Sequence, residues 1–290
     1  MRIAPGQRPA LDEAARSSAP GHFVPLPHGL THYDSAGPPD GQPVVLVPGF
    51  SVPFYVWDPT FAALAAAGFR VLRYDLYGRG YSDRPDVVYD LDLFDRQLQE
   101  LLEAVGLGVP VDVCGVSMGG VIAAAFADRH PQQVRRLCLV DPAGLRRRVP
   151  LSGRLLQVPL LGELMMALFG DRMLLAGTAQ DLTAPERFPE YVENYRPQMR
   201  YAGFKRALLS TMRTLLLRDM TDLYGRVGRG GHPVLVVWGR EDRTVPLALS
   251  AELRRAMPRA QFHIIEGAGH VPHYERPEVV NPLLIAFLRG

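Results

Sequence analysis

The sequence predicts an α/β fold: one mostly parallel, eight-stranded, doubly wound sheet with a helical cap inserted between strands 6 and 7. Three observations support this prediction. Short apolar runs rich in β-branched residues recur along the chain and end in glycine or aspartate, as strands buried on both faces do. Segments with helical periodicity separate them, and such alternation produces parallel strands joined by right-handed crossovers. A long interval of helices without strands, about residues 145–231, interrupts the alternation.

The strands are expected in the following order. Residues 1–20 are polar and proline-dotted and are predicted to be a flexible N-terminal lead-in without an apolar signal core. The stretches "HFVPLPHG" and "LTHYDSAG" are predicted to form an antiparallel hairpin at one edge of the sheet. Six further runs are predicted strands: residues 44–49, 70–75, 111–117, 135–142, 233–239 and 262–267.

Two of the intervening helices have clear boundary signals. Asp58 is predicted to be an N-cap, because Pro59 suits the first helical position and the alanine-rich segment stops at Gly68. In residues 90–106 the apolar side chains fall on one helical face, and Gly106 is the expected C-cap.

The remaining helices define the predicted domain organisation. The α/β core comprises residues 21–144 and 232–290, and the helical cap comprises residues 145–231. The cap contains the apolar stretch "LLQVPLLGELMMALFG", followed by two further helical segments. The arginines Arg146 to Arg148, at the start of the cap, are expected to be solvated rather than to bind phosphate.

Composition narrows the class of protein. The 290 residues are 47% hydrophobic and 21% charged, which is typical of a globular chain with one large core and a smaller attached unit. The net charge of +2 gives no support for a nucleic-acid partner, and no apolar window of about eighteen residues predicts stable membrane insertion. With Cys114 and Cys138 alone, no disulfide framework is expected, and both are assumed to be core residues. A cytoplasmic localisation is therefore expected.

Ser117 is the candidate nucleophile. It is the central residue of Gly115-Val116-Ser117-Met118-Gly119, a G-x-S-x-G motif between a predicted strand and a predicted helix. Glycine at the two flanking positions removes Cβ atoms that would clash in so sharp a turn. The turn presents the serine hydroxyl at the carboxyl edge of the sheet, next to helix N-terminal amides that favour an anion.

A serine nucleophile needs a base, and the base needs an acid. His270 follows "EGAG" directly after the last predicted strand, where glycines allow a loop over the sheet edge; His273 is its rival. Asp242 follows the preceding strand, and the adjacent Glu241 is the alternative acid. Brought together, Ser117, Asp242 and His270 form an acyl-transfer triad. The other histidines are expected to pack on the surface or in the core: His22, His28, His32, His130, His232 and His263.

Four sequence blocks together resemble the α/β-hydrolase fold superfamily, in its lid-bearing serine esterase or lipase-like branch. "GVSMGG" resembles the family's nucleophile elbow, "WGREDRTVP" its acid loop and "GAGHVPHYERP" its histidine loop. "RYDLYGRGYSDRP" is similar to the family's Asp-x-x-Gly-x-Gly-x-Ser segment after the fourth strand. The resemblance implies an oxyanion hole made by the backbone N–H groups of Phe50 and Met118. This chain has Pro48-Gly49-Phe50 where many members carry His-Gly, which leaves the shape of that loop open.

The expected reaction is hydrolysis of carboxylic esters with small to medium, apolar acyl groups through an acyl-enzyme, as in a carboxylesterase or monoacylglycerol lipase. Neither a metal nor an organic cofactor is expected, and the expected partner is a small-molecule ester. The predicted substrate pocket consists of Met165, Met166, Phe169 and Val271, although the cap side chains among them can instead pack against the sheet. The oligomeric state is left open.

Three alternative functions share these features. A carbon–carbon bond hydrolase of meta-cleavage products has the same fold and triad, but in that branch a tryptophan commonly follows the histidine, where this chain has Val271. A cofactor-free peroxidase-like hydrolase and a slow hydrolytic ligand receptor are the other two. Serine at position 117 argues against the dehalogenase and epoxide hydrolase branches, which resemblance associates with an aspartate nucleophile.

Overall fold

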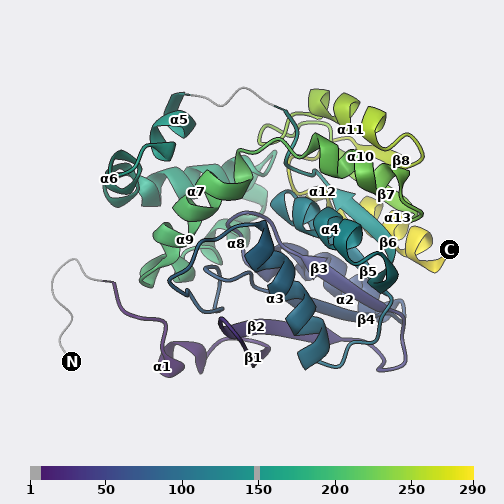
Figure 1. Ribbon diagram of the computed structural model, residues 1–290, viewed down its shortest axis with the longest axis horizontal. Coiled ribbons are helices and arrows are strands. Elements are labelled where there is room, and N and C mark those ends of the chain that lie inside the picture. The colour runs from purple at the N-terminus through teal and green to yellow at the C-terminus, as the bar shows by residue number, and fades with distance from the viewer. Residues whose placement is uncertain (1–7, 147–150) are drawn as a thin grey trace.

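The computed structural model describes residues 8–146 and 151–290, and its eight strands form one sheet in the order β1-β2-β4-β3-β5-β6-β7-β8 (Figure 1). Within it, β1 pairs antiparallel with β2 and β2 with β4, and the other neighbours are parallel. The predicted mostly parallel, eight-stranded sheet with an edge hairpin is therefore confirmed. The strands are β1 (His22–Leu26), β2 (Gly29–Ala36), β3 (Pro43–Val47), β4 (Arg70–Tyr74), β5 (Val111–Val116), β6 (Val134–Val140), β7 (Val234–Gly239) and β8 (Gln261–Ile265).

The central strands are buried on both faces, which explains their continuous apolar sequences. Every residue of β5 and of β7 is buried. Cys114 on β5 lies opposite Cys138 on β6, and both cysteines are buried and free. Two apolar clusters cover the sheet, one on each face.

Helices from distant parts of the chain cover the two faces. One face packs against α3 (Leu91–Ala104), α4 (Met118–Arg129), α10 (Thr221–Arg229) and α11 (Ser250–Ala256). The other packs against α2 (Asp58–Ala66), α12 (Pro272–Glu275) and α13 (Pro277–Arg289). Helix α2 begins one residue earlier than predicted: Trp57 is its N-cap, and the Asp58 carboxylate pairs with Arg73 instead of capping the helix. The N-cap prediction for Asp58 was therefore wrong.

Helices fill the described part of the interval between β6 and β7. They are α5 (Leu151–Gln157), α6 (Leu161–Leu168), α7 (Gly170–Gln180), α8 (Pro189–Glu193), α9 (Phe204–Thr211) and α10, with a π-helical turn at Met212–Leu216. Figure 1 shows α5, α6, α7 and α9 together at one side of the sheet. In contrast, α10 packs against α4 and α11 on the flank of the sheet. The boundaries 145 and 231 of the cap stay a prediction.

Short 3₁₀ turns complete the connections between the main elements. They lie at Phe54–Trp57, Pro131–Gln133, Pro185–Arg187, Pro197–Arg200 and Leu247–Leu249. Residues 1–7 of the predicted lead-in lie outside the described residues, as do Arg147 and Arg148. The described lead-in contains α1 (Glu13–Arg16), and Arg16 pairs with Asp83. Among the described helices, none has the length and apolar character needed to cross a bilayer.

Candidate active site

Ser117 lies in the turn between β5 and α4. Its backbone has φ 55° and ψ −120°, a conformation that costs a non-glycine residue roughly 1–3 kcal/mol. Hydrogen bonds to β6 and to the loop that follows it hold this conformation: the Ser117 N–H donates to the Val140 carbonyl over 2.9 Å, and its carbonyl accepts from Ala143 N–H over 3.0 Å. The strain is therefore offset by backbone pairing at the carboxyl edge of the sheet.

The glycines beside Ser117 are required by close backbone approach. A Cβ atom on Gly115 would lie 2.2 Å from the Gly119 carbonyl oxygen. A Cβ atom on Gly119 would lie 2.4 Å from the Pro48 carbonyl oxygen. Both distances are far below van der Waals contact, so the elbow can form only with glycine at these two positions.

His270 and Asp242 form a buried pair on neighbouring loops, after β8 and β7. The Nδ1 atom of His270 lies 2.8 Å from Oδ2 of Asp242. The other oxygen of Asp242 accepts from the N–H groups of Thr244 and Val245, each over 2.8 Å. Burial raises the pKa of Asp242, but the adjoining His270 imidazole and these hydrogen bonds hold it below its ordinary value. Asp242 is therefore an ionised carboxylate aimed at the ring.

The rival acid and the rival base lie elsewhere. Glu241 is exposed, and its side chain accepts from the N–H of Ala268. His273 is fully buried against Trp57, with 4.2 Å between ring centroids, and burial lowers its pKa to about 3. The structure thus pairs His270 with Asp242 and leaves Glu241 and His273 out of this arrangement.

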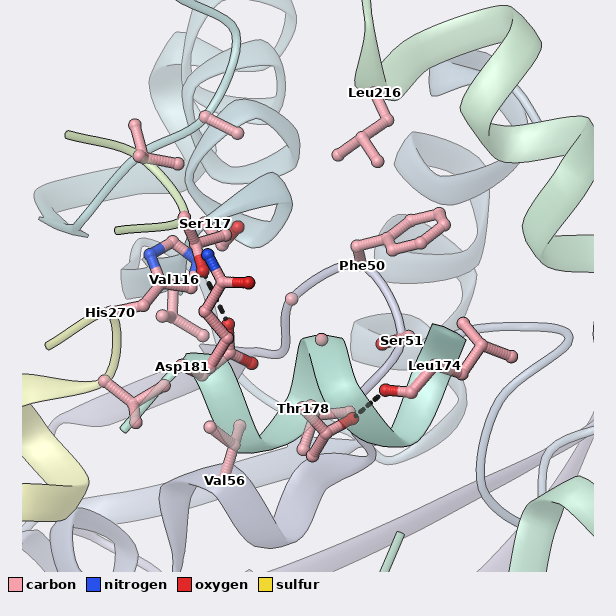
Figure 2. A pocket seen from close by; sticks show the side chains of 18 of the residues that line it. Phe50, Ser51, Val56, Val116, Ser117, Leu174, Thr178, Asp181, Leu216 and His270 are labelled. Carbon is pink, nitrogen blue, oxygen red and sulfur yellow. Dashed lines mark hydrogen bonds between the residues drawn. The ribbon is translucent and has the colours of Figure 1, made fainter. Parts of the chain in front are cut away.

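Ser117 and His270 line one cavity of about 410 Å³ between the sheet edge and the cap (Figure 2). Most of its wall is apolar, formed by Phe50, Val52, Val56, Val116, Ala143, Leu156, Met166, Met173, Leu174, Met212, Leu216, Val245 and Val271. Of the four predicted pocket residues, Met166 and Val271 lie in this wall. Met165 packs into a neighbouring apolar cluster, and Phe169 is 56% exposed, so neither lines the cavity.

The Pro48-Gly49-Phe50 loop passes beside the nucleophile. A Cβ atom on Gly49 would lie 3.5 Å from Cβ of Ser117. Buried Arg79 holds the loop by donating from Nε to the Phe50 carbonyl over 2.8 Å. Within the described chain, the N–H groups of Phe50 and Met118 make no hydrogen bond to another residue. Neither amide is therefore occupied by an acceptor within the described chain, as the predicted oxyanion-hole donors require.

Three acidic residues near the pair were not identified from the sequence. Asp181, the C-cap of α7, accepts from His270 N–H at its carbonyl and from Thr244 Oγ at its carboxylate, and burial raises its pKa to about 6. Glu275 on α12 bonds the loop that carries His270. Asp141 follows β6 directly and is buried. Asp141 had a usable signal, because it lies at the end of a predicted strand, residues 135–142, whereas Asp181 in the helical cap has none.

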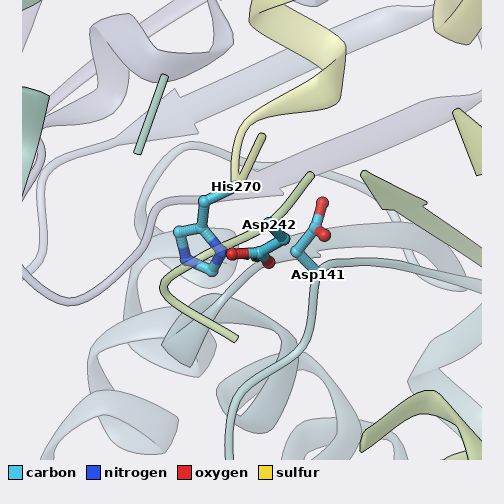
Figure 3. A group of neighbouring side chains, drawn as sticks. All are labelled: Asp141, Asp242 and His270. Carbon is cyan, nitrogen blue, oxygen red and sulfur yellow. Dashed lines mark hydrogen bonds and ion pairs between the residues drawn. The ribbon is translucent and has the colours of Figure 1, made fainter. Parts of the chain in front are cut away.

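Potential ligand atoms of Asp141, Asp242 and His270 lie within 4.8 Å of one another (Figure 3). These donor types also occur in metal sites. Here the Nδ1 atom of His270 is already hydrogen-bonded to Asp242. We therefore treat the group as an acid–base cluster.

Comparison with known proteins gives consistent matches. The family model for the alpha/beta hydrolase fold matches residues 42–277. The chain is 31% identical over 300 residues to the 2-hydroxy-6-oxononadienedioate/2-hydroxy-6-oxononatrienedioate hydrolase 1 of Dechloromonas aromatica, covering 96% of this chain and 97% of that protein. It is 28% identical over 246 residues to Lipase 3 of a Moraxella species, covering 81% and 73% of the two chains. A thermophilic esterase from Thermogutta terrifontis superposes with a TM-score of 0.76 at 26% identity, covering 94% and 96%.

Proposed function

Because this chain belongs to the alpha/beta hydrolase fold family, we propose that it is a serine hydrolase that cleaves carboxylic esters through an acyl-enzyme. One observation carries the proposal. Ser117, held in a strained turn, lines the same cavity as His270, and the Nδ1 atom of His270 is hydrogen-bonded to buried Asp242. A hydroxyl, an imidazole and a carboxylate in this order have the roles of nucleophile, base and orienting acid.

The reaction begins at Ser117. As its hydroxyl attacks the ester carbonyl carbon, His270 takes the hydroxyl proton at Nε2, because Nδ1 is committed to Asp242. The Asp242 carboxylate stabilises the imidazolium that forms. His270 then gives the proton to the departing alcohol oxygen, which leaves an acyl group on Ser117.

The N–H groups of Phe50 and Met118 stabilise the tetrahedral intermediate. Each donor of this kind contributes about 3–4 kcal/mol to the transition state. In the second half of the reaction His270 activates a water molecule, which attacks the acyl carbon. The acid is released and Ser117 regains its proton.

The cavity supports small to medium, apolar acyl groups as the substrate class. Its volume of about 410 Å³ lies in the range of small-molecule sites. The methionines Met166, Met173 and Met212 in the wall are unbranched and flexible, so they adapt to acyl chains of different shape.

A carbon–carbon bond hydrolase is the second candidate. The relative from Dechloromonas aromatica acts on a dioate, a substrate with two carboxylates. Arg243 supports an acidic substrate, because it is the only lysine or arginine among the described residues of the cavity wall. Asp181 lies in the same wall, and its negative charge when it is ionised disfavours an acidic substrate. We favour ester hydrolysis because the remaining wall is mostly apolar.

Replacement of Ser117 by alanine tests the proposal. With p-nitrophenyl esters of increasing acyl length, Ser117→Ala is expected to lower kcat/KM by at least about 10³-fold and to abolish labelling by a fluorophosphonate. Ser51→Ala is the matched control, because Ser51 lines the same cavity and is expected to retain activity within a few-fold. Full activity of Ser117→Ala refutes the proposal. A higher kcat/KM on a dienol diketo acid than on every ester would favour the second candidate.

A further inference from the structure

Asp141 is a buried carboxyl group that the proposed mechanism does not use. It follows β6, it has no exposed surface, and its backbone has a φ of 41°. Aspartate tolerates this left-handed conformation better than most residues, but burial of its carboxyl group costs additional free energy. Two hydrogen bonds to β7 hold it there: its N–H donates to the Val237 carbonyl, and its Oδ1 accepts from Gly239 N–H, each over 2.9 Å. Its side chain therefore has a fixed direction.

The second oxygen of Asp141 is buried without a donor. Within the described chain no N–H or O–H group reaches Oδ2. Another carboxyl group, that of Asp242, lies beside Asp141, with potential ligand atoms of the two side chains within 4.8 Å of each other (Figure 3). Two carboxylates cannot hydrogen-bond to each other, so both groups are satisfied only if one proton lies between them.

The surroundings decide which group holds the proton. Asp242 faces an imidazole and accepts two backbone N–H groups. Asp141 accepts one backbone N–H, and the charged groups that face it are the acids Asp242 and Glu275. Burial, followed by the Asp242 carboxylate, raises the pKa of Asp141 well above its usual range. The ionised member of the pair is Asp242.

We propose that Asp141 is a positioning residue that remains protonated at neutral pH and donates a hydrogen bond from Oδ2 to the Asp242 carboxylate. This bond would fix the orientation of Asp242 toward His270. It would also leave a single negative charge behind the imidazole. A second negative charge at Asp141 would stabilise the imidazolium form of His270 and disfavour the neutral base that takes the serine proton. The proposed role in catalysis rests on the proposed function of Ser117.

Three variants test the role of Asp141. Asp141→Asn keeps an acceptor for Gly239 N–H and places an N–H donor toward Asp242, so kcat is expected to stay within about threefold of the wild type. Asp141→Ala removes the donor and is expected to lower kcat at least tenfold, with KM little changed. Asp86→Asn, at an exposed aspartate paired with Arg206, is the control and is expected to have no effect.

The pH profile separates a neutral Asp141 from a charged one. If Asp141 is neutral, Asp141→Asn changes no charge, and the acid limb of kcat/KM stays where it is in the wild type. If Asp141 is ionised, Asp141→Asn removes a negative charge and lowers the pKa of the acid limb by about one unit. A shift of this size would overturn the proposal. A tenfold loss of kcat in Asp141→Asn would also overturn it.

A spectroscopic measurement is independent of activity. With ¹³Cγ-labelled aspartate, the wild type is expected to show one carboxyl signal that remains protonated at pH 8 and that is missing in Asp141→Asn but present in Asp86→Asn. Absence of a protonated carboxyl from the wild type overturns the proposal even if both Asp141 variants fail to fold. If Ser117→Ala kept full activity, the catalytic assignment would fail, whereas this signal would still report the proton on Asp141.

Discussion

Glu275 joins the cap to the loop that carries His270, and its replacement by glutamine tests that connection. The Glu275 side chain is buried. Its Oε1 accepts from the N–H and the hydroxyl of Thr183, over 2.7 and 2.6 Å, and its Oε2 accepts from Gly269 N–H over 2.6 Å. Thr183 follows α7 in the chain, and Gly269 directly precedes His270. Glutamine has almost the same shape but only one acceptor oxygen.

The size of the effect follows from these three bonds. In Glu275→Gln the amide NH₂ group must face either the buried Gly269 N–H or the two part-buried donors of Thr183, so at least one donor loses its acceptor. Losing a hydrogen bond to a charged group and leaving its donor unpaired costs about 2–4 kcal/mol. For 290 residues the entropy of unfolding is about 0.6 kcal/mol/K, so this free energy corresponds to a fall in Tm of roughly 3–7 °C. Because the loop also positions His270, we expect kcat to fall about tenfold or more.

Thermal unfolding followed by circular dichroism, together with kcat on a p-nitrophenyl ester, measures both effects. Glu266→Gln is the control: Glu266 lies in the same loop, but its side chain is 67% exposed and pairs with Arg240 at the surface. That variant is expected to change the free energy of unfolding by less than about 0.5–1 kcal/mol. If Glu275→Gln matches the control in both Tm and kcat, Glu275 does not hold the catalytic loop.

Two further predictions concern pH. Burial keeps His273 neutral, with its pKa lowered to about 3 from 6.5, so the folded protein loses stability as the pH falls below about 6.5, by about 1.4 kcal/mol per unit. In urea unfolding, His273→Phe is expected to reduce the difference in stability between pH 7.5 and pH 5 by about 2 kcal/mol. The variant is expected to retain ester hydrolysis. A folded but inactive variant would instead indicate that His273 is the base. Burial raises the pKa of Asp181 to about 6 from 3.8, so its ionisation destabilises the folded state as the pH rises through 6. Asp181→Asn is therefore expected to stabilise the protein at pH 8 and to have no effect at pH 3.5. The gain at pH 8 is expected to be less than about 3 kcal/mol, because the side chain is partly exposed. An equal effect at both pH values would contradict this prediction.

Local sequence determined the sheet and the nucleophile turn. A strand covered on both faces needs an apolar side chain at nearly every position, so β5 and β7 are recognisable from their own residues. The elbow at Ser117 is also recognisable from its own residues, although only Gly115 is required by a near neighbour in the chain, and Gly119 is required by the backbone of Val47 and Pro48 at the end of β3. The glycines before His270 likewise indicated the loop after β8.

Tertiary structure alone decided which side chains surround the candidate catalytic pair. His270 and His273 are three residues apart, yet one ring contacts Asp242 and the other is sealed against Trp57. In the cap, Met166 lines the cavity while Phe169 faces solvent, because the packing of the short cap helices determines which side chains are buried. The charge of an acid such as Asp141 or Asp181 depends on groups brought near it from other elements. A carboxyl's protonation is set by through-space neighbours and desolvation, and a one-dimensional pattern contains neither.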